Sequence, residues 1–390
     1  MKWAARGPCF TTPSSLGSNI LMSFQPFPPC RQPHVSALPT AKVLVLGLGD
    51  LGARIASGLA RIGTAAEIVV ASRQLARGAA FARLTSACGP TPVRFTATDG
   101  LDFGALRALI RAERPDLIVQ CASLLSPWVL FARTDPQAFA LRTAGFALQL
   151  CAQLPVVHNL MNALAEEDNQ CPVVNCSYPD LTNAVLATQG LAPLIGIGNA
   201  GMIRALAPAA HDAAGPLRLF AHHSQVGAVV CADRARLGDT PPPRLFRGNT
   251  EYPADPLFSG IALPQDQELN ALSASHAVDI AAALLPDGTP LRTAAPGPLG
   301  LPGGWPVLIT PSSVALDLPA SATAADFLPF QHQSARGDGI AGMAADGTVH
   351  FTDALRARLP SQWRMLAEPL RPEEALARHT QLLAALKVVA

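Results

Sequence analysis

Three glycines spaced G-x-G-x-x-G, Gly47, Gly49 and Gly52, follow an apolar run at 42–46 and open a stretch with apolar residues at helical spacing over 51–62. In this setting Gly47 allows a tight turn, Gly49 lets the backbone approach a pyrophosphate, and Gly52 lets the helix pack close to the strand. The helix start adds free N–H groups and a partial positive charge. We therefore expect a dinucleotide's phosphates on the loop formed by Gly47, Leu48, Gly49, Asp50, Leu51 and Gly52.

The end of the next apolar run, 68–71, indicates which dinucleotide binds. An NAD site usually has Asp or Glu there to hold the ribose 2′-hydroxyl. This chain instead has Ser72 and Arg73, with Arg77 one helical turn later. Because a guanidinium pairs with phosphate in a fixed fork geometry, these residues favour NADP(H) over NAD(H). The alternative is that both arginines belong to an ordinary solvated helix start.

One later strand end is expected near the nicotinamide, since ligands in open parallel sheets bind outside the carboxyl ends of strands. The apolar run 116–121 ends in Cys121, Ala122 and Ser123, small residues that suit close approach to a flat ring. The alternative is an ordinary strand-to-helix loop. A strand at 193–197, followed by Gly198, Asn199 and a helix, has the same strand–turn–helix order as the first phosphate loop.

Hydride chemistry also needs one proton donor or acceptor from the protein. His222 and His223 lie on an expected strand, where neighbours point to opposite faces, so at most one of them should face the cleft. Tyr178 sits at a strand end, where its phenol can act as an acid. The competing explanations are a hydrogen-bonded structural histidine and a packing tyrosine.

Two asparagines and one further histidine complete the candidates. Asn175 and Asn199 can orient a carboxamide or a substrate carbonyl, and turn and cap roles compete evenly with that one. His332 is a late alternative without a predicted position. We find no zinc-ligand spacing among eight scattered cysteines and nine histidines, so no metal is expected.

The elements that must position these residues alternate between strand and helix, which predicts an N-terminal Rossmann-type, doubly wound parallel sheet. Expected strands cover 42–46, 68–71, 92–97, 116–121, 172–176 and 193–197. Expected helices cover 51–62, 103–111, 139–150, 156–164, 181–188 and 202–210, with Pro155 separating the third from the fourth.

A second, mixed α+β domain is expected after Gly215. We predict strand-like segments at 217–226, 228–231, 308–310 and 314–318, a loop at 238–260, a helix at 266–285, and a hairpin of 339–344 with 348–351. Residues 363–386 should be helical and are expected to return to the first domain. The resulting domains are a disordered extension at 1–40, a Rossmann domain at 41–204, a substrate domain at 205–352 and C-terminal helices at 353–390. Translation from Met22 is the alternative to the extension.

Composition limits the class of protein. Of 390 residues, 49% are hydrophobic and 15% charged, which allows a large core. A net charge of +1 argues against a nucleic-acid surface. No run of 18 apolar residues occurs, so no membrane span is expected. We expect free thiols in a reducing cytoplasm and a possible homodimer.

The chain resembles the saccharopine dehydrogenase-like reductases over about residues 42–205. The resemblance rests on the loop 45–52, the Ala71-Ser72-Arg73 strand end, Gln120-Cys121-Ala122, and the segments 175–180 and 196–199. It implies a Rossmann domain, a mixed α/β substrate domain and NAD(P)-linked chemistry, commonly on an amine, imine or amino-acid carbon.

Together these observations predict an NADP(H)-dependent oxidoreductase that acts on a small carbonyl, imine or amino-acid-type substrate in an interdomain cleft. Two alternatives remain. The first is a non-catalytic NADP(H)-binding sensor that signals redox state to a partner. The second is an enzyme that uses NADP in a transient oxidation without net redox change.

Overall fold

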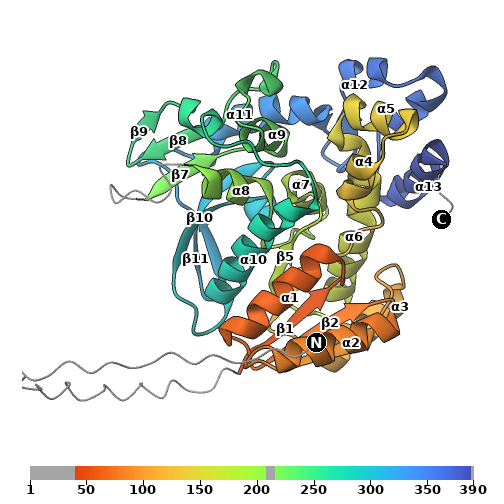
Figure 1. Cartoon of the computed structure of the whole chain (residues 1–390), viewed down its shortest axis with the longest axis vertical. Helices are drawn as coiled ribbons and strands as arrows, with labels where there is room; N and C mark the ends of the chain where they lie inside the picture. Colours follow the sequence, from red (N-terminus) through yellow and green to blue (C-terminus); the bar gives the residue numbers. More distant parts are fainter. Residues whose placement is uncertain (1–39, 208–215, 388–390) are drawn as a thin grey trace, which may run out of the picture. The chain divides into compact units, whose positions relative to one another are not determined.

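The computed structural model describes residues 40–207 and 216–387 (Figure 1). Apart from Thr40, the extension expected at 1–40 lies outside the described residues. The same holds for residues 208–210, where the helix expected over 202–210 would end, and for residues 388–390. The domain boundaries at 204 and 352 stay predictions.

Within residues 40–207, six strands form one parallel sheet in the order β3-β2-β1-β4-β5-β6. This is the strand order of the Rossmann fold, so the predicted fold class is confirmed. The strand order reverses between β1 and β4, because β2 and β3 lie on one side of β1 and the later strands lie on the other. Ligands bind in the crevice at such a switch point. The strands are β1 (Lys42–Leu46), β2 (Glu67–Ser72), β3 (Val93–Ala97), β4 (Leu117–Gln120), β5 (Val173–Asn175) and β6 (Ile195–Gly196).

Both faces of the sheet are covered because its central strands carry apolar side chains on both sides. On β1, Val43 and Val45 pack into a cluster with α1 (Asp50–Ile62) and α10 (Asn270–Leu284), which lie side by side in Figure 1. Leu44 and Leu46 point the other way, toward α3 (Phe103–Glu113) and α6 (Leu150–Glu166). Alternating side chains thus make two cores on one sheet.

The expected break at Pro155 was wrong. Helix α6 runs through Pro155 without interruption, and the chain breaks earlier at Gly145, whose φ is +155°. Burial along most of α6 compensates for the hydrogen bond that Pro155 lacks. The remaining helices of this part are α2 (Leu75–Ala87), α4 (Pro127–Ala132), α5 (Pro136–Ala144), the 3₁₀ helix η1 (Phe146–Gln149), α7 (Pro179–Ala187) and α8 (Asn199–Leu206).

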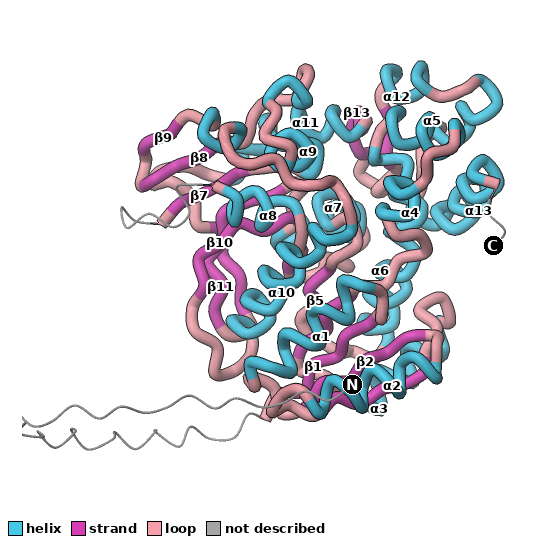
Figure 2. Tube along the Cα trace, viewed as in Figure 1, coloured by secondary structure: helices cyan, strands magenta, loops and turns pink. Residues whose placement is uncertain are grey.

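The rest of the described chain is mixed α and β, with antiparallel sheets (Figure 2). Strands β7, β8 and β9 form one sheet, β10, β11 and β12 a second, and β13 with β14 the predicted hairpin. Their bounds are β7 (Leu217–Phe220), β8 (Arg244–Arg247), β9 (Thr250–Tyr252), β10 (Leu291–Pro296), β11 (Gly304–Thr310), β12 (Ser313–Leu316), β13 (Ile340–Met343) and β14 (Val349–Phe351).

The strand expected over 217–226 and 228–231 was also wrong. It ends at Phe220, and the chain turns into the 3₁₀ helix η3 (His223–Gln225) and α9 (Val226–Val230). The turn is fixed by a capping box in which the His222 side chain accepts from Ser224 N–H and the Gln225 side chain accepts from His222 N–H. The two histidines therefore do not alternate across a strand.

Some elements were not predicted from the sequence. The segment expected as a loop, 238–260, contains β8 and β9, and β10 and helix α11 (Ala324–Asp338) were not predicted. Residues 363–386 form three helical pieces rather than one helix. They are the 3₁₀ helices η8 (Ser361–Ala367) and η9 (Pro372–Glu374) and helix α13 (Ala375–Leu386), preceded by α12 (Asp353–Arg358).

The C-terminal helices return to the first part of the chain, as expected. Helix α13 packs on α6, and α12 packs on α5. In the described residues no single helix is long and apolar enough to cross a membrane, and Pro136–Ala144 with Phe146–Glu166 passes that test only as a pair bent by 109°.

Candidate functional site

A cavity of about 800 Å³ opens at the carboxyl ends of β1, β4 and β5. It is lined by the glycine loop and the strand ends on one side, and by residues of η1, η3, α10 and α11 on the other. The predicted site residues that line it are Gly47, Leu48, Gly49, Asp50, Leu51, Gly52, Ser72, Arg73, Arg77, Cys121, Ala122, Ser123, Tyr178, Asn199 and His223.

The glycine loop has the shape expected of a phosphate cradle. Gly47 has a φ of +105°, and a β-carbon there would lie 2.6 Å from the backbone nitrogen of Ala122. A β-carbon on Gly52 would lie 2.0 Å from the Gly47 carbonyl oxygen, whereas one on Gly49 would meet nothing within 4 Å. Because no side chain caps α1 at Gly49, the N–H groups of its first turn stay available to an anion. This donor set fits a dinucleotide pyrophosphate.

Two cationic side chains stand where the second strand ends. Arg73 and Arg77 are exposed and line the cavity, and neither makes a hydrogen bond or ion pair with another described residue. Ser72 is half-buried beside them. Asp99, at the end of β3, also lines the cavity and accepts a hydrogen bond from Leu101 N–H at 3.0 Å. Asp99 was not predicted from the sequence.

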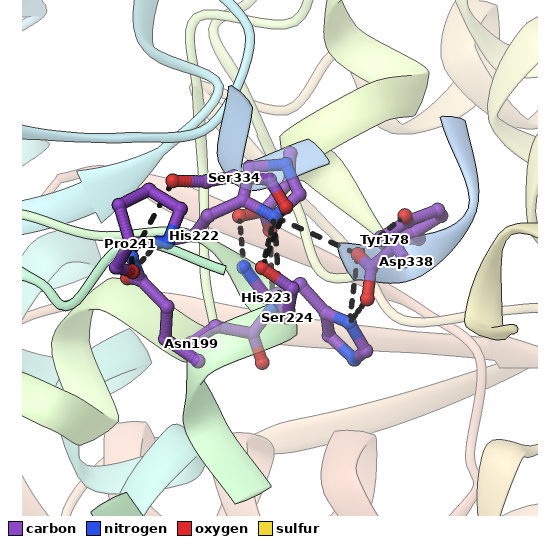
Figure 3. A network of polar contacts seen from close by, with 10 residues as sticks. Tyr178, Asn199, His222, His223, Ser224, Pro241, Ser334 and Asp338 are labelled. Atoms are coloured by element: carbon purple, nitrogen blue, oxygen red, sulfur yellow. Dashed lines mark hydrogen bonds and ion pairs between the residues drawn. The ribbon is translucent and has the colours of Figure 1, made fainter. Parts of the chain in front are cut away.

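A buried carboxylate, Asp338, joins two of the predicted proton carriers (Figure 3). The Tyr178 hydroxyl donates to Asp338 Oδ2 at 2.7 Å, and His223 Nδ1 lies 2.8 Å from Asp338 Oδ1. His223 is 21% exposed at its side chain and lines the cavity, whereas Asp338 is 4% exposed. With Nδ1 committed to Asp338, the ring nitrogen Nε2 has no hydrogen-bond partner among the described residues and is available to a ligand.

Burial and charge pairing have opposite effects on the pKa values of His223 and Asp338. Burial opposes charge on His223, but the Asp338 carboxylate outweighs it and raises the pKa of His223 above its usual value. Burial likewise opposes charge on Asp338, and His223 outweighs it, so the pKa of Asp338 is lowered. Burial and the neighbouring Asp338 charge raise the pKa of Tyr178. Near neutral pH the network therefore contains a carboxylate, a neutral phenol and an imidazole that gains a proton readily.

The backbone around the network is also specialised. Tyr178 takes the left-handed conformation at φ 49°, which is uncommon and costly for a residue with a side chain. The Phe146 ring lies against the His223 ring with centroids 3.8 Å apart and an interplanar angle of 33°. The Phe146 ring and the Asp338 carboxylate together hold the His223 imidazole at the wall of the cavity.

Asp180 ties Asn199 to the same region. Its Oδ1 accepts from His223 N–H at 3.0 Å, and its Oδ2 accepts from Asn199 Nδ2 at 3.0 Å. Asp180 does not cap α7, whose N-cap is Tyr178. The carboxylate instead aligns the start of η3 with the start of α8.

Three predicted site residues lie elsewhere. Asn175 is fully buried and does not line the cavity; its amide donates to Thr182 and Asn183 while its oxygen accepts from Ser177 N–H, so it has the turn role. His222 is buried behind the wall, 3.6 Å from Asp338, and burial lowers its pKa. The expectation that the two histidines alternate across a strand was wrong, since both approach Asp338, but only His223 lines the cavity. His332 is exposed on α11 and does not line the cavity.

Asp338, Phe146 and Gln149 also lie at this site and were not predicted from the sequence. Gln149 is 4% exposed, lines the cavity and has an Oε1 atom without a partner among the described residues. A signal for Asp338 was present, because Thr323 and Asp326 form a capping box and Gly339 ends the helix at φ +97°. These caps bracket α11 and place Asp338 at its last residue.

No family model matches the chain, and no curated protein matches its sequence. A solved lactate dehydrogenase from a Medee basin deep-sea metagenome library is 14% identical, with a TM-score of 0.43 over 77% of this chain and 97% of that one. A short chain dehydrogenase from Mycobacterium smegmatis is 21% identical, with a TM-score of 0.26 over 35% and 58%. We draw no functional conclusion from likenesses this weak.

Proposed function

We propose that the protein is an NADP(H)-dependent oxidoreductase that acts on a small carbonyl, imine or amino-acid-type substrate, with His223 exchanging the proton. The observation that carries this proposal is one cavity that holds both a glycine loop open at Gly49 and an imidazole held by Asp338. The motifs resembling saccharopine dehydrogenase-like reductases support a substrate of the amine or imine type.

The residues present fit the cofactor. The loop 47–52 and the start of α1 would hold the pyrophosphate, and Arg73 and Arg77 would hold a 2′-phosphate. When bound, the nicotinamide would supply a hydride to the reacting carbon or take one from it.

His223 supplies the proton chemistry. Its Nδ1 donates to Asp338, so Nε2 is the atom that faces substrate. In the reducing direction the protonated imidazole donates from Nε2 to the substrate oxygen or nitrogen, and in the oxidising direction the neutral ring accepts that proton at the same atom. Asp338 holds the tautomer and stabilises the imidazolium. Phe146 covers one face of the ring and keeps water from it.

The proposal is tested by titrating the protein with NADPH and NADH side by side. Trp128 lines the cavity and donates to Asn270 at 3.0 Å, so tryptophan fluorescence should report binding. We expect tight NADPH and weak NADH, followed by NADPH oxidation with a panel of small ketones and imines. Binding of NADPH without turnover of any member would overturn the catalytic assignment and favour a redox sensor.

The 2′-phosphate contact has its own variant, Arg73→Asp. Removing a charged hydrogen bond worth about 1.5–3 kcal/mol should weaken NADPH by roughly tenfold to a hundredfold and leave NADH nearly unchanged. The matched control is Arg83→Asp, which removes an exposed arginine of the helix that follows, α2, and this arginine does not line the cavity. Equal losses for the two dinucleotides would contradict NADP(H) specificity.

A further inference from the structure

Two cysteines meet at the carboxyl ends of neighbouring strands. Cys121 follows β4 and Cys176 follows β5, and their Sγ atoms are 3.6 Å apart. Both are free thiols and both line the cavity. Because Gln120 is paired with Asn175 in the parallel register, the next residue of each strand stands opposite the other on the same face.

This placement suits a covalent bond between the sulfurs. Neighbouring strands lie about 4.8 Å apart, which is within the Cα separation that disulfides span. The backbone N–H of Cys176 donates to the Gln120 carbonyl at 2.8 Å, so the strand pairing continues up to the cysteines. Closing the bond therefore needs side-chain rotation and a small shift of the strand ends rather than a new backbone path.

We propose that Cys121 and Cys176 form an oxidation site, a dithiol that hydrogen peroxide converts to a disulfide inside the cavity and whose closure weakens dinucleotide binding. The effect on binding rests on the proposed function, whereas the oxidation itself does not. A regulated cavity of this kind would be open under reducing conditions and impaired under peroxide stress.

The reaction balances with peroxide as the oxidant. One thiol gives up its proton, its sulfur attacks a peroxide oxygen, and the O–O bond breaks to leave a sulfenic acid and a hydroxide, which takes that proton and becomes the first water. The second thiol sulfur then attacks the sulfenic sulfur, the S–S bond forms, and the departing hydroxide takes the thiol proton as the second water. Two thiols lose two electrons, and one peroxide is reduced to two waters.

The contacts around the pair connect it to the glycine loop. Cys121 precedes Ala122, whose backbone packs so closely on Gly47 that a β-carbon there would lie 2.6 Å from its nitrogen. A β-carbon on Gly52 would lie 3.3 Å from Cys121 Cβ. Drawing the sulfurs from 3.6 Å to a bond of about 2.05 Å pulls directly on this packing.

The other strand leads to the proton-carrying network. Cys176 precedes Ser177, whose hydroxyl donates to the Ala122 carbonyl at 2.9 Å, and then Tyr178, which donates to Asp338. The two strand ends are thus already linked one residue beyond the thiols. A disulfide would therefore displace the glycine loop, through Ala122, and the Tyr178–Asp338 pair, through Ser177, at the same time.

The experiment treats the full chain with hydrogen peroxide and maps its peptides without reduction. We expect a linked peptide pair containing Cys121 and Cys176, formed faster at pH 9 than at pH 7. The reason is that the thiolate is the nucleophile, and the adjoining Cys121 thiol and burial raise the pKa of Cys176. The pair should be missing from Cys121→Ser and present in Cys88→Ser, a control at an exposed thiol. Absence of the linked pair from the wild type would overturn the oxidation site.

NADPH titration of the oxidised protein tests the second half of the proposal. We expect at least tenfold weaker binding, restored by dithiothreitol, and slower disulfide formation when NADPH is already bound. Unchanged NADPH affinity in a fully cross-linked sample would overturn the effect on binding. If the reduced protein binds neither NADPH nor NADH, the proposed function fails, while the linked peptide still decides whether the oxidation site exists.

Discussion

Asp338 decides what His223 can do in this molecule. A buried carboxylate is stable only when it is paired, and here it accepts from the Tyr178 hydroxyl and lies against His223 Nδ1. The same interactions raise the pKa of His223 and leave its Nε2 toward the cavity. A structural histidine would have both nitrogens committed, so this arrangement favours a proton carrier.

The variant Asp338→Asn should lower the pKa of His223, because the carboxylate that favours the imidazolium is gone while burial remains. NMR titration of the imidazole signals measures this shift without any substrate, and His223→Gln assigns the signal. The control His332→Gln changes an exposed residue of α11, the helix that also carries Asp338, and should leave the His223 titration unchanged.

The same variant predicts a change in activity with a definite sign. Reduction needs His223 protonated, so its rate should fall as pH rises through the His223 pKa, and in Asp338→Asn that fall should occur at lower pH. We expect a loss of about 10²–10⁴ in kcat at neutral pH with any ketone or imine that the wild type reduces. An unchanged pH profile would exclude Asp338 as the residue that positions His223.

At the scale of elements, the turn from β1 into α1 contains two glycines of the same motif, Gly49 and Gly52, whose surroundings differ. Gly52 faces the Gly47 carbonyl, where a β-carbon would lie 2.0 Å away, whereas Gly49 faces open cavity. One glycine is therefore required by the fold and the other only by what enters the cavity.

The paired variants Gly49→Val and Gly52→Val separate these roles. Gly49→Val should keep a melting temperature close to the wild type and lose NADPH binding by at least tenfold, because its side chain occupies the pyrophosphate position. Gly52→Val should be destabilised by several kcal/mol or fail to fold, since backbone must move to admit it. Thermal melts and NADPH titration of both variants provide the test, and full NADPH binding by Gly49→Val would refute the cradle.

At the scale of the whole molecule, the C-terminal helix supports the wall of the cavity. Helix α13 packs on α6, and α6 continues from η1, which carries Phe146 and Gln149. Leu382 is 1% exposed in the cluster that joins these helices, whereas Leu376 on the same helix is 48% exposed.

Leu382→Ala should therefore lower the free energy of unfolding by about 2–5 kcal/mol, because it leaves a cavity between α13 and α6. Leu376→Ala should change it by roughly 0.5 kcal/mol or less, since that side chain is already half in water. Urea denaturation of the two variants measures the difference. Similar values for both would mean that α13 contributes little to the fold.

The parallel sheet, the glycine loop and the arginines at the end of β2 could be predicted from the sequence alone. These depend on residues close together in the chain, where apolar periodicity and glycine spacing act locally. It could not show that His223 leaves the strand, because the capping box of His222 and Gln225 overrides strand propensity.

The contacts between residues far apart in the chain could be read only from the folded structure. Asp338 reaches Tyr178 and His223 across 160 and 115 residues, and Cys121 reaches Cys176 across 55. No local pattern records such pairs, since they arise when the sheet aligns its strand ends and α11 packs beside η3. Local periodicity fixes the elements, whereas packing brings their ends together, and the proposed chemistry lies at those ends.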